Sequence, residues 1–183
     1  DEPVEQRIDL PEALVSLATK TPPASSWAAQ RYLTKRGVTK SDILKWKIGY
    51  CAEGEYAGRI IVPSFNSHGY ANYFIARSYG YEWPRYKNPP ASRDIIFNEL
   101  YVNWDEDIVI VEGVFDAIKA GNAVPLLGST LREGSALLEA LVKNNTRVFL
   151  ALDEDVSRKS RSIARLLLKY GVEAYEVNTS GFE

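Results

Sequence analysis

Residues 107–116 have the sequence DIVIVEGVFD, in which an apolar run ends at Glu112. Consecutive β-branched residues bounded by polar ones predict a short buried strand over 107–111. The acidic residues Glu112 and Asp116 then lie just beyond the end of that strand. It is one of two stretches of the chain in which an apolar run stops at an acidic cluster.

A second stretch, TRVFLALDED at residues 146–155, has the same form and ends in Asp153 and Asp155. In an open parallel sheet, ligands bind outside the carboxyl ends of the strands. If the two strands are neighbours, Glu112, Asp116 and the two later aspartates converge, and their charges repel unless a cation neutralises them. Such all-oxygen sites suit Mg²⁺ or Mn²⁺. A lone acidic residue at a strand end is more often a solvated cap; the pair of clusters favours a metal site for phosphate chemistry.

The second half of the chain alternates strands and helices. The expected elements are strands at 107–111, 123–127, 146–152 and 172–177, with helices at 115–120, 134–143 and from Ser157 or Ser160 to Tyr170. Thr130 and Glu133 match a capping box before the second of these helices. Strands separated by helices of this length predict parallel pairing with right-handed crossovers.

The first half has a different pattern. The expected elements are helices at 27–36 and 41–46 and strands at 47–51, 59–62 and 70–78. The last two strands are joined through residues 66–69, a plausible hairpin turn. Residues 1–24 hold one short apolar patch and end in the linker signal Pro22-Pro23.

Charge is distributed unevenly along the chain. The whole chain has a net charge of −2, but residues 20–93 hold twelve Lys and Arg against four Asp and Glu, whereas residues 94–183 hold nine against fifteen. A basic part can hold phosphate backbones by counterion release, and an acidic part can place cations on a reacting phosphate. Interleaved Tyr and Trp residues can stack bases. The plain alternative is that surface Lys and Arg keep the protein soluble, and composition leaves both open.

The two acidic clusters resemble the toprim domain. Its pattern is Glu-Gly-x-x-Asp-Ala, here beginning at Glu112, followed some forty residues later by Asp-x-Asp, here Asp153 to Asp155. The turn at residues 128–130, Gly-Ser-Thr, also fits this pattern. The domain is shared by bacterial-type primases, topoisomerases, and some nucleases and recombination factors.

The segments upstream resemble one branch more narrowly, the catalytic core of bacterial-type and phage-type DNA primases. The matching segments follow in the family's own order, at residues 31–38, Ile43, 48–50, 59–63, 69–77, 83–89 and 96–101. The resemblance implies an N-terminal extension at 1–24, a basic subdomain at 25–104 and a toprim domain at 105–183. The implied fold class is α/β, a mixed α+β subdomain followed by a largely parallel sheet flanked by helices.

The resemblance also implies roles for single residues. The implied catalytic residues are Glu112, Asp153 and Asp155, and the implied ligands of two Mg²⁺ or Mn²⁺ ions are Glu112, Asp116, Asp153 and Asp155. Glu112 is also expected to take the proton of an attacking 3′-hydroxyl. The residues implied to contact nucleic acid or nucleotide are Arg36, Arg59, Arg77, Arg85 and Lys87. Guanidinium groups suit phosphate oxygens well.

This chain departs from the family pattern at three places. Asn98 stands near the Phe97 turn, where the family has a basic residue. Ser157 and Arg158 follow the Asp-x-Asp where the family has Ala and Gly, which brings a basic arm near the metals. The family has a further acidic ligand beyond the last strand, where this chain ends, so we expect this piece to synthesise primers poorly by itself.

The chain has no Met and is expected to be a piece of a longer protein. Its single Cys51 and single His68 exclude a disulfide framework and a Cys/His zinc site within it. The implied zinc module and helicase-binding part are expected outside this chain. No apolar run approaches the ~20 residues of a membrane span, and no signal peptide is visible. The sequence thus predicts a cytoplasmic protein, of a bacterium or, from its compact and divergent segments, of a bacteriophage.

The implied function is synthesis of short RNA primers by metal-dependent nucleotidyl transfer. The implied partners are a single-stranded DNA template, NTPs, the RNA primer and a replicative helicase, and no membrane. One alternative is a toprim nuclease or another toprim phosphotransfer enzyme that uses the same carboxylates. A topoisomerase is disfavoured, because no tyrosine-bearing cleavage domain fits in this length. A third alternative is a non-catalytic remnant that binds nucleic acid.

Overall fold

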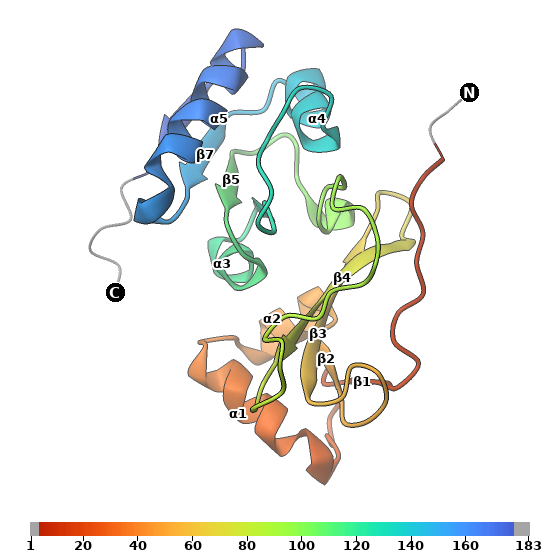
Figure 1. The fold of residues 1–183 in the computed structure, drawn as a ribbon. Helices are drawn as coiled ribbons and strands as arrows, with labels where there is room; N and C mark the ends of the chain where they lie inside the picture. The colour runs from red at the N-terminus through yellow and green to blue at the C-terminus, as the bar shows by residue number, and fades with distance from the viewer. Residues whose placement is uncertain (1–3, 178–183) are drawn as a thin grey trace. The chain divides into compact units, whose positions relative to one another are not determined.

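The computed structural model describes residues 4–177 (Figure 1). The chain divides into two units, with the boundary between Ala91 and Ser92. We call residues 4–91 the first unit and residues 92–177 the second unit. Each unit has its own sheet of four strands.

The sheet of the first unit is antiparallel, in the order β1-β2-β3-β4. Its strands are β1 (Leu14–Ser16), β2 (Gly49–Cys51), β3 (Arg59–Phe65) and β4 (Ala71–Ser78). The three strands expected from the sequence are confirmed. Strand β1 was not expected, because it is short and gains its place only by pairing with β2, 33 or more residues away along the chain.

The turn between β3 and β4 is built by Asn66, and the predicted hairpin is confirmed. The side-chain carbonyl of Asn66 accepts hydrogen bonds from the backbone N–H groups of His68 and Tyr70, at 3.1 and 2.9 Å. Gly69 has a φ of +83°, a conformation that costs glycine little. The side chain therefore shapes the turn that sets the register of the two longest strands.

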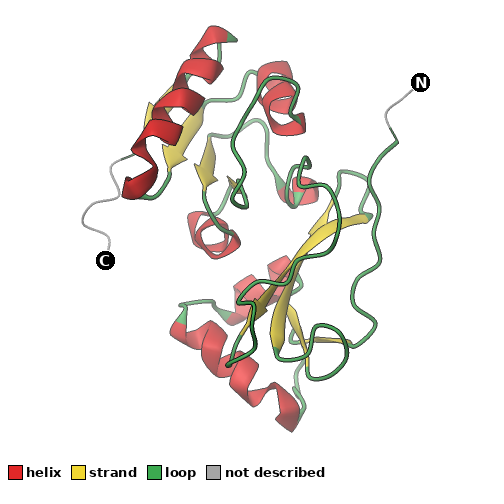
Figure 2. Ribbon diagram, viewed as in Figure 1, coloured by secondary structure: helices red, strands yellow, loops and turns green. Residues whose placement is uncertain are grey.

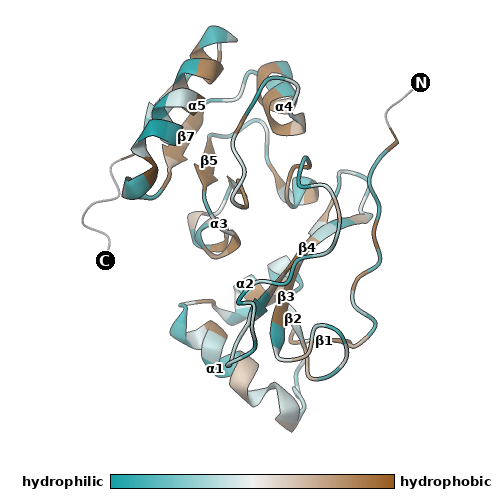
Figure 3. Ribbon diagram, in the orientation of Figure 1, coloured by the Kyte–Doolittle hydropathy of each residue, from teal (hydrophilic) through white to brown (hydrophobic). Residues whose placement is uncertain are grey.

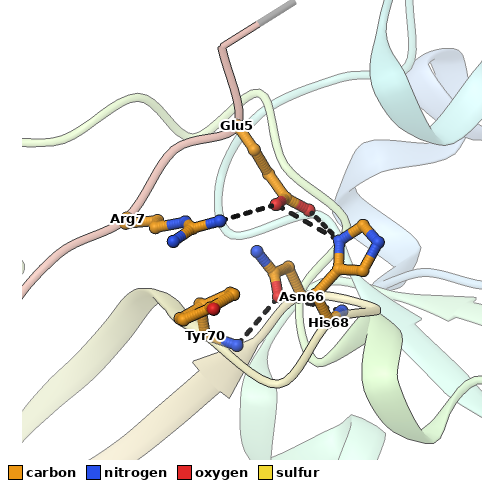
Figure 4. A network of polar contacts seen from close by, with 5 residues as sticks. All are labelled: Glu5, Arg7, Asn66, His68 and Tyr70. Carbon is orange, nitrogen blue, oxygen red and sulfur yellow. Dashed lines mark hydrogen bonds and ion pairs between the residues drawn. The ribbon is translucent and has the colours of Figure 1, made fainter.

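The N-terminal segment is fastened to this hairpin (Figure 4). The Glu5 carboxylate lies 3.0 Å from Nδ1 of His68 and 3.8 Å from the guanidinium of Arg7, which stacks on the ring of Tyr70 at 3.5 Å. Further along, Ile8 donates a backbone hydrogen bond to β4 and packs with Leu10, Ala13 and Leu14 against the core of the unit. These contacts hold a segment that the sequence predicted to be an extension.

Two helices precede β2, α1 (Trp27–Lys35) after a short 3-10 turn η1 (Ala24–Ser26), and α2 (Lys40–Trp46). Both helices were predicted. Thr39 caps α2 by a capping box with Asp42: each side chain bonds the other residue's backbone N–H, at 3.1 and 2.8 Å. Such a box satisfies donors that have no partner within the helix.

The sheet of the second unit is parallel throughout, in the order β6-β5-β7-β8, and helices flank it (Figure 2). Its strands are β5 (Ile108–Val111), β6 (Ala123–Pro125), β7 (Val148–Ala151) and β8 (Ala174–Glu176). Its helices are α3 (Val114–Ala120), α4 (Ala136–Asn144) and α5 (Ser157–Lys169), with short 3-10 turns η2 (Glu99–Tyr101) and η3 (Glu154–Val156). The predicted fold class is confirmed.

One local prediction in this unit was wrong, the capping box at Thr130 and Glu133. Helix α4 begins only at Ala136, because Gly134 has a φ of +76° and cannot lie within a right-handed helix. The N–H of Ala136 is satisfied instead by the carboxylate of Asp94, at 3.1 Å. The cap thus comes from a residue 42 positions away, which local sequence does not reveal.

The core of the second unit lies between its sheet and its helices, and Figure 3 draws β5 and β7 in brown, as hydrophobic strands. Buried side chains from the sheet, from α4 and from α5 form one cluster that includes Ile110, Leu150, Leu141, Ile163 and Leu167. No helix within residues 4–177 is both long enough and apolar enough to cross a membrane.

Candidate functional site

The two acidic clusters lie at the carboxyl ends of neighbouring strands of the second unit. Strands β5 and β7 pair in parallel, with Val111 opposite Ala151, so that Glu112 and Asp153 follow at the same edge of the sheet. Asp116 is in the first turn of α3, directly after Glu112, and Asp155 is in η3. The sequence-based expectation that the two strands are neighbours is confirmed.

The Asp153 carboxyl is affected by the charges of the three other predicted acids. Loss of hydration is the main reason that its pKa is raised, and the carboxylates of Asp116, Glu112 and Asp155 raise it further. The nearby Lys159 ammonium lowers the same pKa. Like charges that raise a pKa must lie within interaction range. The four predicted acids therefore form one electrostatic group, which we call the acidic edge.

A lysine occupies the acidic edge. The ammonium of Lys159, in the first turn of α5, donates to both carboxylate oxygens of Glu112, at 3.0 and 3.1 Å. Only 21% of the Lys159 side chain and 18% of that of Glu112 are exposed, so water screens the pair little. The sequence predicted Arg158 as the basic side chain near the acids, but Arg158 is exposed. The rotation of α5 about its axis decides whether residue 158 or residue 159 faces the acids.

The donor set of the acidic edge fits a hard divalent cation, since it consists of carboxylate oxygens. Within residues 4–177, no three Asp, Glu, His or Cys side chains form a group that could hold an ion as they stand. In addition, Lys159 takes both oxygens of Glu112. Ligation by Glu112 would require this carboxylate to leave the lysine.

Arginines gather around two tyrosines in the first unit. Arg77, on β4, donates from Nε to the hydroxyl of Tyr32 at 2.9 Å, and its guanidinium lies 4.9 Å from the ring centroid of Tyr86. Arg36, at the end of α1, lies 5.3 Å from the ring of Tyr32. Aromatic faces hold guanidinium groups in place at little cost in hydration. Two of the predicted basic residues, Arg36 and Arg77, therefore share one tyrosine.

The other predicted basic residues have different surroundings. Arg85 is exposed. The Lys87 ammonium donates to the backbone carbonyl of Glu55 at 3.0 Å and lies 3.4 Å from its carboxylate. Arg59 is buried, with 5% exposed, and donates to the backbone carbonyls of Ala57 and Pro84 at 3.0 Å each. In this structure Arg59 ties the loop that contains Pro84 to β3 and has almost no surface to offer a ligand.

A cation that the sequence did not single out lies in the second unit. Arg93 donates from Nη1 to the backbone carbonyl of Leu127 at 2.9 Å, next to Gly128 in the Gly-Ser-Thr turn. It lines a pocket of about 380 Å³ together with Ser129, Thr130 and Arg132. Asn98, which stands where the primase pattern has a basic residue, is buried. No motif marked Arg93, since its place depends on a contact 34 residues away.

Comparisons with known proteins give related sequences and related folds. No family model matches the chain. The DNA primase of Thermotoga maritima is 31% identical over 175 residues, a match that covers 69% of this chain and 30% of the relative. The chain thus spans less than a third of that relative's length.

Solved structures match over more of the chain. The structure described as the DnaG primase catalytic domain bound to ssDNA has a TM-score of 0.73 and 17% identity, covering 87% of this chain and 66% of that one. The Aquifex aeolicus primase, with its zinc-binding and RNA polymerase domains, has a TM-score of 0.71 and 22% identity, covering 82% of this chain and 49% of that one. These structures share the fold of this chain, and together with the relative from Thermotoga maritima they confirm the resemblance seen in the sequence.

Proposed function

Because this chain resembles DNA primases in sequence and has the fold of a bacterial-type primase catalytic core, we propose that it is the catalytic part of a primase. In this proposal it synthesises short RNA primers from NTPs on single-stranded DNA. The observation that carries the proposal is the parallel pairing of β5 with β7, which brings the Glu112 and Asp153 clusters to one edge of such a fold.

The acidic edge is the proposed catalytic centre. Glu112, Asp116, Asp153 and Asp155 would hold divalent ions, Mg²⁺ or Mn²⁺, through carboxylate oxygens. Such ions would supply positive charge to stabilise the charge that develops on a transferred phosphoryl group and on the leaving pyrophosphate. Glu112 accepts the proton of the attacking 3′-hydroxyl. Lys159 neutralises Glu112 until the ions and the nucleotide are present.

The basic residues of the first unit are the proposed contacts for template and nucleotide. Arg36, Arg77, Arg85 and Lys87 supply cations to phosphate oxygens, and Tyr32 keeps the first two in position. The burial of Arg59 favours a structural role for it over contact with nucleic acid. A replicative helicase is a further proposed partner, through segments other than those of this chain.

A second candidate function is binding of nucleic acid without catalysis. The observation that favours it is the ion pair in which Lys159 occupies Glu112, a proposed metal ligand. In addition, no group of side chains among the described residues forms a metal site as it stands. Such a protein would bind single strands through the first unit and leave the strand and the NTPs unchanged.

Primer synthesis separates these functions. Labelled NTPs, Mn²⁺ and a single-stranded template are incubated with this chain and, in parallel, with a longer piece that includes the neighbouring segments. We expect labelled RNA from at least the longer piece, and none after Asp153→Asn with Asp155→Asn. Binding without RNA from either piece supports the second candidate. Cleavage of the template in place of synthesis would identify a toprim nuclease.

A further inference from the structure

The first unit has a second surface feature, an open groove of about 940 Å³ between α1 and the turn at residues 79–81. Its lining includes Trp27, Arg31, Tyr32 and Lys35 from α1 and Tyr81 from the turn. Four of these five were assigned no role above. We call this feature the α1 groove.

The α1 groove presents aromatic rings and cations side by side. Trp27 is 71% exposed and Tyr81 is fully exposed, which is unusual for such large apolar side chains. Trp27, Arg31 and Lys35 are spaced by four residues, so they form one stripe along α1. Arg31 and Lys35 are exposed as well. The groove therefore has two exposed rings and two exposed cations along its length.

Within residues 4–177, no acidic side chain is among those that line the α1 groove. The nearest acid along the chain is Glu82, directly after Tyr81. Its carboxylate accepts a hydrogen bond from the hydroxyl of Ser78 at 3.2 Å, and its oxygens lie against the backbone of Gly58 and Gly80. The hydroxyl does not neutralise this carboxylate, but Arg31 and Lys35 outnumber it, so the net charge at the groove is positive.

The α1 groove continues toward Arg36 and Arg77, the two arginines that lie next to Tyr32. Tyr32 lines the groove, and its hydroxyl accepts the hydrogen bond from Arg77 at 2.9 Å. Its ring is also the face against which Arg36 lies. A nucleic-acid strand whose phosphates contact Arg36 and Arg77 would therefore also reach the α1 groove, with Tyr32 between the two places.

We propose that the α1 groove binds single-stranded nucleic acid, with bases stacked on Trp27 and Tyr81 and phosphates paired with Arg31 and Lys35. The proposal rests on the proposed function, and it extends the nucleic-acid path beyond the residues assigned there. Exposed rings alternating with cations are the elements that bind single strands without sequence preference. An acidic peptide would use the two cations but would have no need of the rings.

The test measures the affinity of the whole chain for labelled oligothymidylate by fluorescence anisotropy. Trp27→Ala and Tyr81→Ala should each weaken binding about 5-fold or more, the lower end of the range for loss of one stacked base. The double variant Arg31→Gln, Lys35→Gln should flatten the salt dependence by about 0.7 per lost phosphate contact. The matched controls are Leu44→Ala, an apolar residue of α2 that is 67% exposed, and Lys40→Gln with Lys45→Gln on the same helix. These controls should leave affinity unchanged.

A strand of abasic phosphodiester tests the stacking. It should bind wild type and Trp27→Ala equally, since it has no base to stack, but should still respond to loss of Arg31 and Lys35. If the two aromatic variants bind oligothymidylate like the wild type, the proposal is overturned. If in that case only the Arg31→Gln, Lys35→Gln variant binds both strands more weakly, the surface is purely electrostatic, as expected for an acidic peptide.

The outcome separates this proposal from the proposed function. If Arg36→Ala and Arg77→Ala weaken binding while the groove variants do not, the groove proposal falls and the primase proposal stands. If the groove variants weaken binding but no piece of the protein makes RNA, the groove stands and catalysis falls. Circular dichroism of each variant excludes loss of the fold as the cause.

Discussion

Replacing Lys159 by Met tests the most specific electrostatic feature of this chain. The change keeps an unbranched apolar stem on α5 and removes the ammonium that lies 3.0 and 3.1 Å from the two oxygens of Glu112. Removing one partner of a fully buried ion pair costs about 3–5 kcal/mol, and an exposed pair contributes about 0–1 kcal/mol. Since about a fifth of each side chain is exposed, we expect a loss of about 2 kcal/mol in the free energy of unfolding.

Urea unfolding measures this loss, and the chain offers a matched control. Lys169, also on α5, pairs with Glu133 at 2.6 Å, but 66% and 56% of these side chains are exposed. Lys169→Met should therefore lower the free energy of unfolding much less than Lys159→Met does, because water screens the exposed pair. A cycle that adds Glu112→Gln should give a coupling energy close to the loss expected for Lys159→Met, since the two groups contact each other directly.

A second measurement connects the ion pair to metal binding. If Glu112 is a ligand, its release from Lys159 should tighten Mn²⁺ binding by about tenfold, which corresponds to about 1.4 kcal/mol. Calorimetric titration can detect this. The reasoning is refuted if Lys159→Met is no less stable than Lys169→Met. If Lys159→Met loses stability but binds Mn²⁺ with unchanged affinity, the result supports the ion pair and argues against Glu112 as a metal ligand.

Three further predictions concern the acidic edge, the two arginines next to Tyr32 and a helix cap. Folding raises the pKa of the Asp153 carboxyl, so ionised Asp153 destabilises the folded protein once the pH has risen through that pKa. Asp153→Asn should therefore stabilise the protein at neutral pH, as measured by urea unfolding. Asp153→Asn together with Asp155→Asn should abolish Mn²⁺ binding, and an unaltered titration would argue against the site. Arg36→Ala and Arg77→Ala should each reduce the salt slope of single-stranded DNA binding by about 0.7; slopes equal to that of the wild type would place the path elsewhere. Thr39→Ala should cost about 1 kcal/mol by removing the capping box of α2, and a cost near zero in thermal unfolding would show that the cap is redundant.

Most elements could be predicted from the sequence because their signals are local. The apolar run before Glu112 and the one before Asp153 predicted β5 and β7, and the alternation around them predicted a parallel sheet, which is confirmed. The hairpin at residues 66–69 followed from its turn residues. The division at residues 104 and 105 stays a prediction, as do the roles of the individual site residues.

Other features depend on contacts between residues that are far apart in sequence. The pairing of β1 with β2, the capping of α4 by Asp94 and the burial of Arg59 each require a partner from another segment. The choice of Lys159 over Arg158 requires the rotation of α5 against the sheet. Hydrophobic periodicity and turn chemistry act over a few residues, so these local signals were enough to predict most of the elements and their order. Which charged groups are buried, and which ones meet, was decided by tertiary packing, because the environment of a charge is made by side chains that only the folded chain brings together.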